Sequence, residues 1–322
     1  MDHAERHLFH VDCDTGIDDA MALLYLLLDE RIELTSISTT FGNIGADVAA
    51  GNCLRILDLL DAAPIPVAVG AQRTIRGDVP ELAPHVHGAD GLGETGLAAS
   101  MRELSALSGA ELIVQSVRAQ PGKVHLLATG PLTNLALALG IEPELPRLVA
   151  GVTIMGGAAD APGNQTPAAE ANILHDPEAA RAVLGAGWEC TLVPLDVTMR
   201  EVLTERHRAA LAASPNAAAR LVAAITDFYF DFFSTALYGE RRSPCHDALA
   251  AAIAVGDVVP AVAPVLNVEV DCTDGPGRGA TICDTRGQYS GFPEQPGAYC
   301  RVVLETAGDF PDRLVARLTR GR

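Results

Sequence analysis

Residues 8–20 read LFHVDCDTGIDDA, and the rest of the chain is organised around them. An apolar run leads in and the apolar run Ala20 to Leu28 leads out, which predicts a strand, a tight turn at Thr15-Gly16 and a helix. Four carboxylates fall within eight residues of this stretch: Asp12, Asp14, Asp18 and Asp19.

A helix start accounts for only part of this acidic group. Asp18 and Asp19 suit the first turn of a helix, whereas Asp12 and Asp14 lie on the incoming strand. Carboxylates packed so closely stay ionised most easily around a cation. Because all the ligands are oxygens, the pattern favours calcium or magnesium over zinc.

The composition describes a globular protein with an acidic surface. At 322 residues, 48% hydrophobic and 20% charged, the chain has room for one large α/β domain or two smaller ones. The formal net charge of −18 argues against nucleic acid or an anionic membrane as a partner, and favours a neutral small molecule or a cation. Lys123 is the only lysine, which leaves one candidate for Schiff-base chemistry.

Cysteine usage and hydropathy point to a reducing cytoplasm. The seven cysteines are scattered and form no Cys-x-x-Cys pair, so the spacing suits neither a disulfide framework nor a zinc site. The residues before Leu8 are polar and charged, and we therefore expect no signal peptide. The longest apolar run, Ala20 to Leu28, is too short to span a membrane.

Strand-like and helix-like segments alternate up to residue 200. We expect strands over 32–40, 64–69, 124–128, 151–155 and 191–197, and helices over 46–62, 109–119, from about 131, and from the cap Asp176 to about 185. This alternation predicts an open, largely parallel, Rossmann-like α/β sheet with helices on both faces. With no repeat and no long linker, we expect a single domain over residues 1–322.

Polar residues follow the ends of several predicted strands. Asp14, Asn43, Thr129 and the loop Asn164–Asn172 each lie just past such an end, and His85 and His87 lie in the loop 71–98. Ligands of open α/β sheets bind outside the carboxyl ends of the strands. We therefore expect the residues that follow the strand ends to converge, although they are far apart in the sequence.

The chain becomes helical beyond residue 200. Residues 226–238 hold six of the 14 aromatic side chains, too many for one buried helix face, so we expect one or two of those at 228–238 to cover a ligand. Ser243 is the expected N-cap of the next helix, with Pro244 as its first residue. Strands are expected near 266–271, 280–284 and 299–305, and a last helix from about 310.

Six motifs together resemble the nucleoside hydrolases, the inosine-uridine preferring nucleoside N-ribohydrolases. They occur in that family's order over roughly residues 8–250, and the region of Arg278-Gly279 is similar more loosely. The motifs are Asp12-x-Asp14-x-Gly16-x-Asp18-Asp19, Gly42-Asn43, His87-Gly88, Thr129-Gly130-Pro131-Leu132-Thr133-Asn134, the region of Gly163-Asn164, Glu170-x-Asn172 and Asp176-Pro177-Glu178-Ala179-Ala180, and His246-Asp247.

The resemblance implies calcium-dependent hydrolysis of the N-glycosidic bond of ribonucleosides, of the inosine or uridine type, to free base and ribose. It implies that Ca²⁺ is held by Asp14, Asp19, Asp247 and the carbonyl of Thr129. The implied ribose contacts are Asp18, Asn43, Asn164, Glu170 and Asn172. Asp14 would take a proton from the attacking water, His246 would protonate the departing base, and His87 would contact the base. A homodimer or homotetramer is implied as well.

Two departures from the family pattern concern the site. Position 15 is Thr where many members have Pro, which loosens the turn. Ala171 stands between Glu170 and Asn172, where an aromatic residue is common. Because this removes one wall of the base pocket, the preference between purine and pyrimidine stays open.

Two other functions compete with this interpretation. A haloacid-dehalogenase-type, magnesium-dependent phosphatase also begins with Asp-x-Asp after a strand, but it favours Thr or Val where this chain has Gly16, and its lysine follows a strand whereas Lys123 precedes one. A calcium-dependent nucleoside-binding protein without turnover would not need Asp14 or His246, and both are present.

Overall fold

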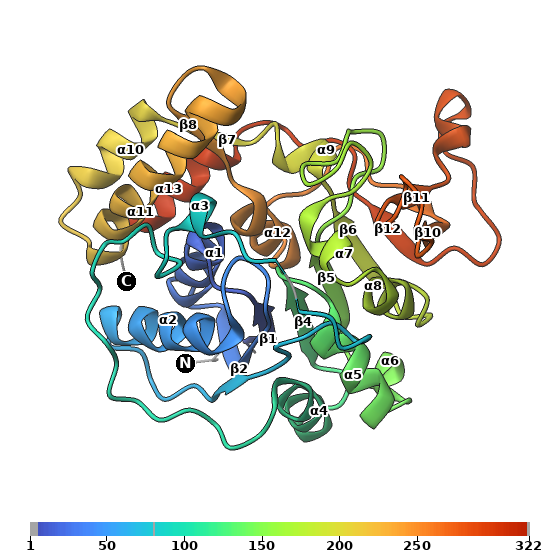
Figure 1. Ribbon diagram of the computed structural model, residues 1–322, viewed down its shortest axis with the longest axis horizontal. Coiled ribbons are helices and arrows are strands. Elements are labelled where there is room, and N and C mark those ends of the chain that lie inside the picture. The colour runs from blue at the N-terminus through green and yellow to red at the C-terminus, as the bar shows by residue number, and fades with distance from the viewer. Residues whose placement is uncertain (1–5, 80, 321–322) are drawn as a thin grey trace.

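A computed structural model describes residues 6–79 and 81–320, and an eight-stranded sheet runs through it (Figure 1). Neighbouring strands are parallel, except that β12 and β9 are antiparallel. The predicted open, largely parallel sheet is confirmed. The strands in spatial order are β3 (Val67–Val69), β2 (Ile32–Thr39), β1 (His7–Cys13), β4 (Val124–Ala128), β5 (Gly151–Met155), β6 (Cys190–Val193), β12 (Cys300–Val302) and β9 (Val265–Leu266).

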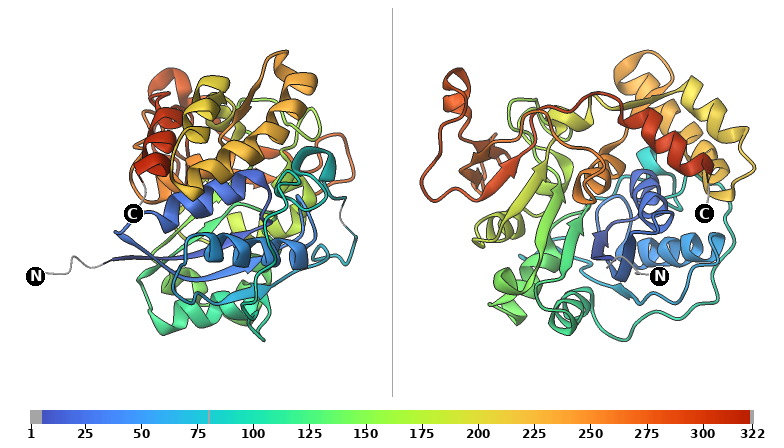
Figure 2. Two further views of the ribbon diagram at one scale, coloured as in Figure 1. Left: turned by 90° about the vertical axis from the view of Figure 1, so that its left-hand side faces the viewer. Right: turned by 180° about the vertical axis from the view of Figure 1, so that it is seen from behind.

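Helices cover both faces of the sheet, and each face has its own hydrophobic core. One face packs against α1 (Ile17–Leu27), α2 (Ala46–Leu59), α11 (Ala217–Phe233), α12 (His246–Ala254) and α13 (Phe310–Arg320), with α10 (Glu205–Ala212) outside them. The other packs against α4 (Gly109–Ala119), α5 (Thr133–Ile141), α6 (Leu145–Leu148) and α8 (Pro177–Leu184). The two layers are separated by the sheet in Figure 2.

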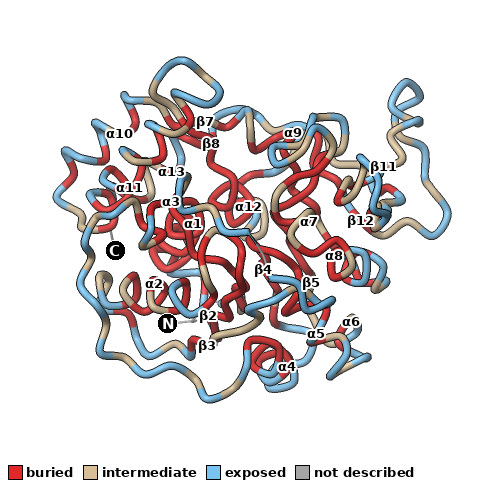
Figure 3. Tube along the Cα trace, in the orientation of Figure 1, coloured by how far each residue is buried: buried red, intermediate tan, exposed pale blue. Residues whose placement is uncertain are grey.

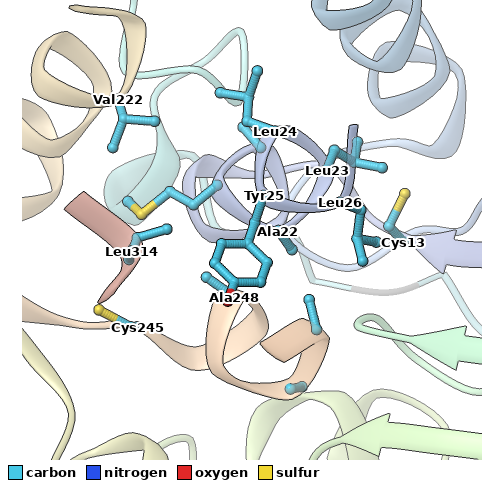
Figure 4. Packing of buried hydrophobic residues seen from close by; sticks show 14 of the residues in the cluster. Cys13, Ala22, Leu23, Leu24, Tyr25, Leu26, Val222, Cys245, Ala248 and Leu314 are labelled. Carbon is cyan, nitrogen blue, oxygen red and sulfur yellow. The ribbon is translucent and has the colours of Figure 1, made fainter. Parts of the chain in front are cut away.

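Helix α1 lies at the centre of the larger core. Every residue of α1 is buried, as the red trace in Figure 3 shows, and its neighbours are α2, α11, α12 and α13. In Figure 4 the α1 side chains Leu24 and Tyr25 point to opposite sides of the helix, among residues of the neighbouring helices such as Val222, Ala248 and Leu314. A helix that is apolar on all sides is stable only when other elements of the protein surround it. The Asp-rich turn that precedes α1 is thereby fixed in a rigid position.

The strand order places the predicted site residues together. Strand β1 lies between β2 and β4, which is where the order of the sheet reverses. Asp14 follows β1, Asn43 follows β2 and Thr129 follows β4. In open α/β sheets this switch point is the place where ligands bind.

In two segments the type of secondary structure differs from the sequence prediction. The strand expected over 191–197 ends at Val193, because Pro194 has no N–H for the ladder, and a short helix α9 (Leu195–Thr198) follows. The helix expected from Ser243 begins at His246 with Cys245 as its cap. Residues Arg242–Pro244 instead form β8, which pairs with β7 (Val202–Thr204) at an edge that tolerates proline.

Smaller elements complete the chain. The loop 71–98 contains a short helix α3 (Pro84–His87), α7 (Ala171–His175) precedes α8, and α11 continues into a π-helical turn, Ser234–Tyr238. The antiparallel pair β10 (Val268–Val270) and β11 (Thr281–Cys283), with a 3₁₀ turn at Thr285–Ser290, projects to one side (Figures 1 and 2).

The thiols and the helices of the structure bear on the compartment in which the protein works. All seven cysteines are free thiols. Within the described ranges, no helix is both long enough and apolar enough to cross a membrane. Residues 1–5, on which the expectation about a signal peptide partly rests, lie outside the described residues.

A buried histidine on β1 forms a hydrogen-bonded chain that ends at Asp12. His10 is fully buried, with Nδ1 at 2.7 Å from Ser36 Oγ and Nε2 at 2.8 Å from Ser38 Oγ. Ser38 Oγ donates to Asp12 Oδ1 at 2.5 Å, so it accepts from His10. Burial lowers the pKa of His10 to about 3, and the ring is therefore neutral.

In the variant His10→Gln, the free energy of unfolding should decrease less on acidification than it does in the parent. Between the ordinary pKa of 6.5 and about 3, the unfolded chain binds more protons than the folded one, so the free energy of unfolding falls as the pH falls. Urea unfolding at pH 7.5 and 5.5 measures this loss. The parent should lose about 1.4 kcal/mol more than the variant between these pH values. Equal losses would mean that folding does not lower the pKa of His10.

Candidate active site

A cavity of about 550 Å³ lies at the carboxyl ends of the strands. Most of the predicted site residues line it, although they come from distant parts of the sequence. They are Asp18, Asn43, His87, Thr129, Asn164, Glu170, Asn172, His246 and Asp247. Asp14 and Asp19 are buried next to these residues without lining the cavity.

Three carboxylates meet at the base of the cavity. Oxygen atoms of Asp18, Asp19 and Asp247 lie within 4.8 Å of one another. Asp18 and Asp19 come from the first turn of α1, and Asp247 from the first turn of α12, which packs against α1. All three side chains are buried.

Asp14 stands beside this cluster. Its Oδ2 accepts from the backbone N–H of Asn43 at 2.6 Å, while Oδ1 is buried without a hydrogen-bond partner. The close approach requires a glycine at position 42, because a Cβ there would lie 1.9 Å from Asp14 Oδ2. The Gly42-Asn43 motif therefore holds Asp14 in place.

Asp19 is oriented by three donors. Its Oδ1 accepts from Thr129 Oγ1 at 2.7 Å, and its Oδ2 accepts from Gly16 N at 2.8 Å and from Asn43 Nδ2 at 3.1 Å. These donors follow β4, β1 and β2 in turn. The switch point of the sheet thus fixes one carboxylate of the cluster from three sides.

The cluster lacks compensating positive charge. Burial, followed by the neighbouring carboxylates, holds the pKa of Asp14 and Asp247 well above the usual range. Burial raises the pKa of Asp18 and of Asp19 to about 6. None of the described residues that line the cavity is lysine or arginine.

A hard divalent cation fits this donor set. The available donors are all oxygens, and both Asp14 Oδ1 and Asp18 Oδ1 are buried without a hydrogen-bond partner. An unpaired buried carboxylate oxygen is costly unless a cation or a donor satisfies it. Oxygen-only sites of high negative charge suit calcium or magnesium.

Glu170 and Asn172 form another part of the cavity lining. Glu170 caps α7: Oε1 accepts from Asn172 N at 2.9 Å, and Oε2 accepts from Gly157 N at 2.9 Å and Ile173 N at 3.2 Å. Burial raises the pKa of Glu170 to about 7. Asn172 Nδ2 donates to the carbonyl of Thr129 at 2.9 Å, the carbonyl predicted to bind calcium. Asn164 Oδ1 accepts from Ala171 N at 3.0 Å and so ties its loop to α7.

Two neutral histidines border the cavity. His87 Nδ1 accepts from Ile17 N at 3.1 Å and lies 3.8 Å from Asp18 Oδ1. Because burial lowers the pKa of His87 to about 4, this contact with Asp18 is polar rather than ionic. His246 Nδ1 lies 2.8 Å from Thr198 Oγ1, and burial lowers the pKa of His246 to about 3.

The aromatic helix divides its side chains between the cavity and the core. Tyr229, Phe232 and Phe233 line the cavity, and Tyr229 OH donates to Asp18 Oδ2 at 3.1 Å. Phe230 is fully buried on another side of α11, with the Arg241 guanidinium 5.7 Å from its ring centre. His85, from α3, is exposed and meets the Phe232 ring edge-on at 5.8 Å.

Two positions near the site, Thr198 and Asp196, carry polar roles that the sequence interpretation missed. Thr198 contacts His246. Asp196 accepts from the N–H groups of residues 159–161 and so shapes a loop that borders the cavity. Asp12, which the sequence analysis grouped with the other carboxylates, accepts from Asn134 Nδ2 at 2.8 Å and from Ser38 Oγ. A proline directly after a strand, at position 194, was the signal for the short helix that carries Asp196 and Thr198.

Comparison with known proteins agrees with this geometry. The sequence model described as inosine-uridine preferring nucleoside hydrolase matches residues 9–309. A protein named probable uridine nucleosidase 2, from Arabidopsis thaliana, is 36% identical over 72% of this chain and 72% of its own length. The pyrimidine-specific ribonucleoside hydrolase RihA of Shewanella sp. (strain MR-4) is 38% identical over 74% of each chain.

A solved structure extends the similarity to the whole described fold. The purine-preferring ribonucleoside hydrolase from Gardnerella vaginalis is 30% identical, with a TM-score of 0.89, covering 97% of this chain and 98% of the other. The family match and these relatives identify a hydrolase of the N-glycosidic bond. The chain belongs to the inosine-uridine preferring nucleoside hydrolase family. It is an N-ribohydrolase of ribonucleosides, and the haloacid-dehalogenase interpretation is excluded. This family is metal-dependent, and Asp18, Asp19 and Asp247 form an acidic site of the required kind.

Proposed function

We propose that the enzyme is calcium-dependent and hydrolyses ribonucleosides of the uridine and inosine type to free base and ribose. The observation that carries this proposal is the group of buried carboxylates at the base of a cavity whose described lining has no lysine or arginine. A cation balances this charge, and a neutral sugar is the substrate that such a cavity tolerates.

Asp14, Asp19, Asp247 and the carbonyl of Thr129 are the proposed calcium ligands. Calcium accepts six to eight oxygens in irregular geometry, which suits several carboxylates and a carbonyl better than the strict octahedron of magnesium. When bound, calcium would hold the two ribose hydroxyls and lower the pKa of a water. Thr129 O already accepts from Asn172 and keeps a second lone pair for this purpose.

The polar residues of the cavity bind and orient the sugar. Asp18 Oδ1, which lacks a partner, accepts from a ribose hydroxyl. Glu170 accepts three backbone N–H groups and retains one lone-pair site, which we assign to the 5′-hydroxyl. Asn43, Asn164 and Asn172 contact the remaining sugar oxygens. Together the carboxylate and amide oxygens of these side chains stabilise the positive charge that develops on the ribose as the bond to the base breaks.

Asp14 and His246 carry the proton transfers. Asp14 takes the proton of the attacking water, for which its unpartnered Oδ1 is available. His246 is neutral at pH 7 and meets the leaving base as an N–H donor. Negative charge that develops on the base strengthens this hydrogen bond until the base takes the N–H proton, and the proton that Asp14 removed from the attacking water returns through solvent to the ring. His87 is the second candidate contact of the base.

The names of the relatives bear on the finer properties. Both curated relatives are named for uridine or pyrimidine substrates, and the similar solved structure for purines, so we infer that uridine is the better substrate and inosine the second.

The free cysteines support a reducing cytoplasm. A single domain and a homodimer or homotetramer remain predictions from the sequence. The test of the main proposal is the release of ribose from a panel of ribonucleosides.

Compared with the parent, the variant Asp247→Asn should be more stable without calcium and less stable with it. In the parent, chelation should abolish activity, and calcium should restore it and raise the melting temperature, since the ion binds only the folded state. Without calcium, the variant should melt about 2–4 °C above the parent, because one repelling charge is gone. Adding calcium should then raise the melting temperature of the variant little or not at all.

Asp274→Asn is the matched control, since Asp274 is an exposed aspartate outside the cavity. It should respond to calcium like the parent in differential scanning calorimetry. A parent that stays active after exhaustive chelation would disprove the proposed metal dependence.

Replacing His246 with Ala should slow the cleavage of uridine by roughly 10²–10⁴-fold, the usual effect of losing a general acid. A nitrophenyl riboside, whose leaving group needs no proton, should be cleaved at nearly the parent rate. The comparison is made by steady-state kinetics on both substrates, with His7→Ala, an exposed histidine at the start of β1, as control. Equal losses on the two substrates would assign His246 to the sugar or to the fold.

The enzyme should reject 5′-monophosphates and 2′-deoxynucleosides. At pH 8, Glu170 is ionised and repels a phosphate, with an expected loss of roughly 10³-fold in kcat/KM. The deoxy sugar leaves Asp18 unpaired, and such a mismatch can cost as much as roughly 10⁴–10⁵-fold. The measurement is kcat/KM for inosine, inosine monophosphate and 2′-deoxyinosine in one calcium buffer.

Glu170→Gln sharpens this test, since it removes the charge but keeps the shape. The gap between inosine and its monophosphate should narrow in this variant, while the gap to 2′-deoxyinosine persists. Hydrolysis of the monophosphate as fast as inosine by the parent would show that the 5′-hydroxyl does not meet Glu170.

A further inference from the structure

Thr198 is a buried hydroxyl directly behind His246. It ends α9, the short helix that follows β6, and it has no exposed surface. Its Oγ1 lies 2.8 Å from His246 Nδ1, which is the one hydrogen-bond contact of this hydroxyl within residues 6–79 and 81–320. Thr198 does not line the cavity, so it can reach the substrate only through His246.

The direction of this hydrogen bond decides where the imidazole carries its proton. If Nδ1 carried the proton, Nδ1 would donate to Thr198 and the buried hydroxyl proton would have no acceptor, which costs free energy. If the hydroxyl donates to Nδ1, both groups are satisfied. A neutral ring then carries its proton on Nε2.

The opposite edge of the ring opens into the cavity. His246 lines the cavity, and Nε2 has no hydrogen-bond partner among the described residues. It is also absent from the buried polar atoms that are left unpaired, so protein atoms do not close it off.

We propose that Thr198 is a positioning residue that holds His246 in the Nε2–H form, so that the edge facing the cavity is a donor and not an acceptor. The proposal rests on the proposed role of His246 as donor to the leaving base. A leaving base needs a donor at the atom where its negative charge develops. The other tautomer would present a lone pair there and would repel that charge.

His87 is held by a parallel arrangement from another part of the chain. The backbone N–H of Ile17 can only donate, so Nδ1 of His87 is the acceptor and Nε2 carries its proton when the ring is neutral. For His246 the same outcome depends on a side-chain hydroxyl, which can be removed by mutation. Thr198→Val removes the hydroxyl with little change of shape, and Thr198→Ser keeps it.

The tautomer is measured directly by nitrogen-15 NMR of histidine-labelled protein, with the His246 signal assigned through the His246→Ala variant. In the parent and in Thr198→Ser, Nε2 should carry the proton and Nδ1 should not. In Thr198→Val the Nδ1–H form should become populated. A parent spectrum with the proton on Nδ1, or an unchanged spectrum in Thr198→Val, would overturn the assignment of Thr198.

Kinetics separate this assignment from the role of His246. Thr198→Val should lower kcat for uridine by roughly 10- to 100-fold, less than the loss of the imidazole itself, and should change KM little. Cleavage of a nitrophenyl riboside should be nearly unaffected, and Thr198→Ser should restore the rate on uridine. A shifted tautomer with an unchanged rate on uridine would support the role of Thr198 and refute that of His246 at the base.

Discussion

Mutual repulsion among buried carboxylates is the constraint on which the rest of the structure depends. Asp14, Asp18, Asp19 and Asp247 are gathered at the ends of β1, α1 and α12. Burial raises all four pKa values, and neighbouring carboxylates raise those of Asp14, Asp19 and Asp247 further. Such a group destabilises a fold unless a cation compensates for it. A lysine or arginine would also compensate, but it would fill the place where a ligand has to bind. The absence of such residues from the described lining of the cavity is therefore what leaves the site available for a metal ion and a sugar.

The scaffold withstands this repulsion because it positions each carboxylate on a rigid element. Helix α1 is buried on all sides and carries two of the four acids in its first turn, while the contact of α12 with α1 brings Asp247 to the same point. Backbone and side-chain donors that follow three neighbouring strands hold Asp19. Gly42 gives Asp14 the space for its hydrogen bond with Asn43. Packing on the sheet thus supplies the free energy that holds the acidic cluster together.

Features that depend on local sequence could be predicted, and those that depend on partners far away in the chain could not. The Asp-rich turn, the helix 109–119, the strand 151–155 and the cap at Asp176 follow from residues within a few positions, and the structure has them. Strand β8 was mistaken for a helix start, because its conformation depends on pairing with β7. Likewise, the sequence around His246 does not predict its hydrogen bond with Thr198, which lies far away in the chain. The aromatic helix was predicted to split between ligand and core, but only the packing of α11 decides that Tyr229, Phe232 and Phe233 face the cavity.

The central claim is that the acidic cluster binds calcium, which in turn binds the cis-diol of ribose. A crystal structure of the protein grown with calcium and ribose, with the ion located by its anomalous scattering, tests this claim most directly. The account predicts one ion at about 2.3–2.6 Å from oxygens of Asp14, Asp19, Asp247 and Thr129, with the 2- and 3-hydroxyls of the sugar completing its coordination. An ion bound elsewhere, or a sugar whose hydroxyls do not contact the ion, would contradict it.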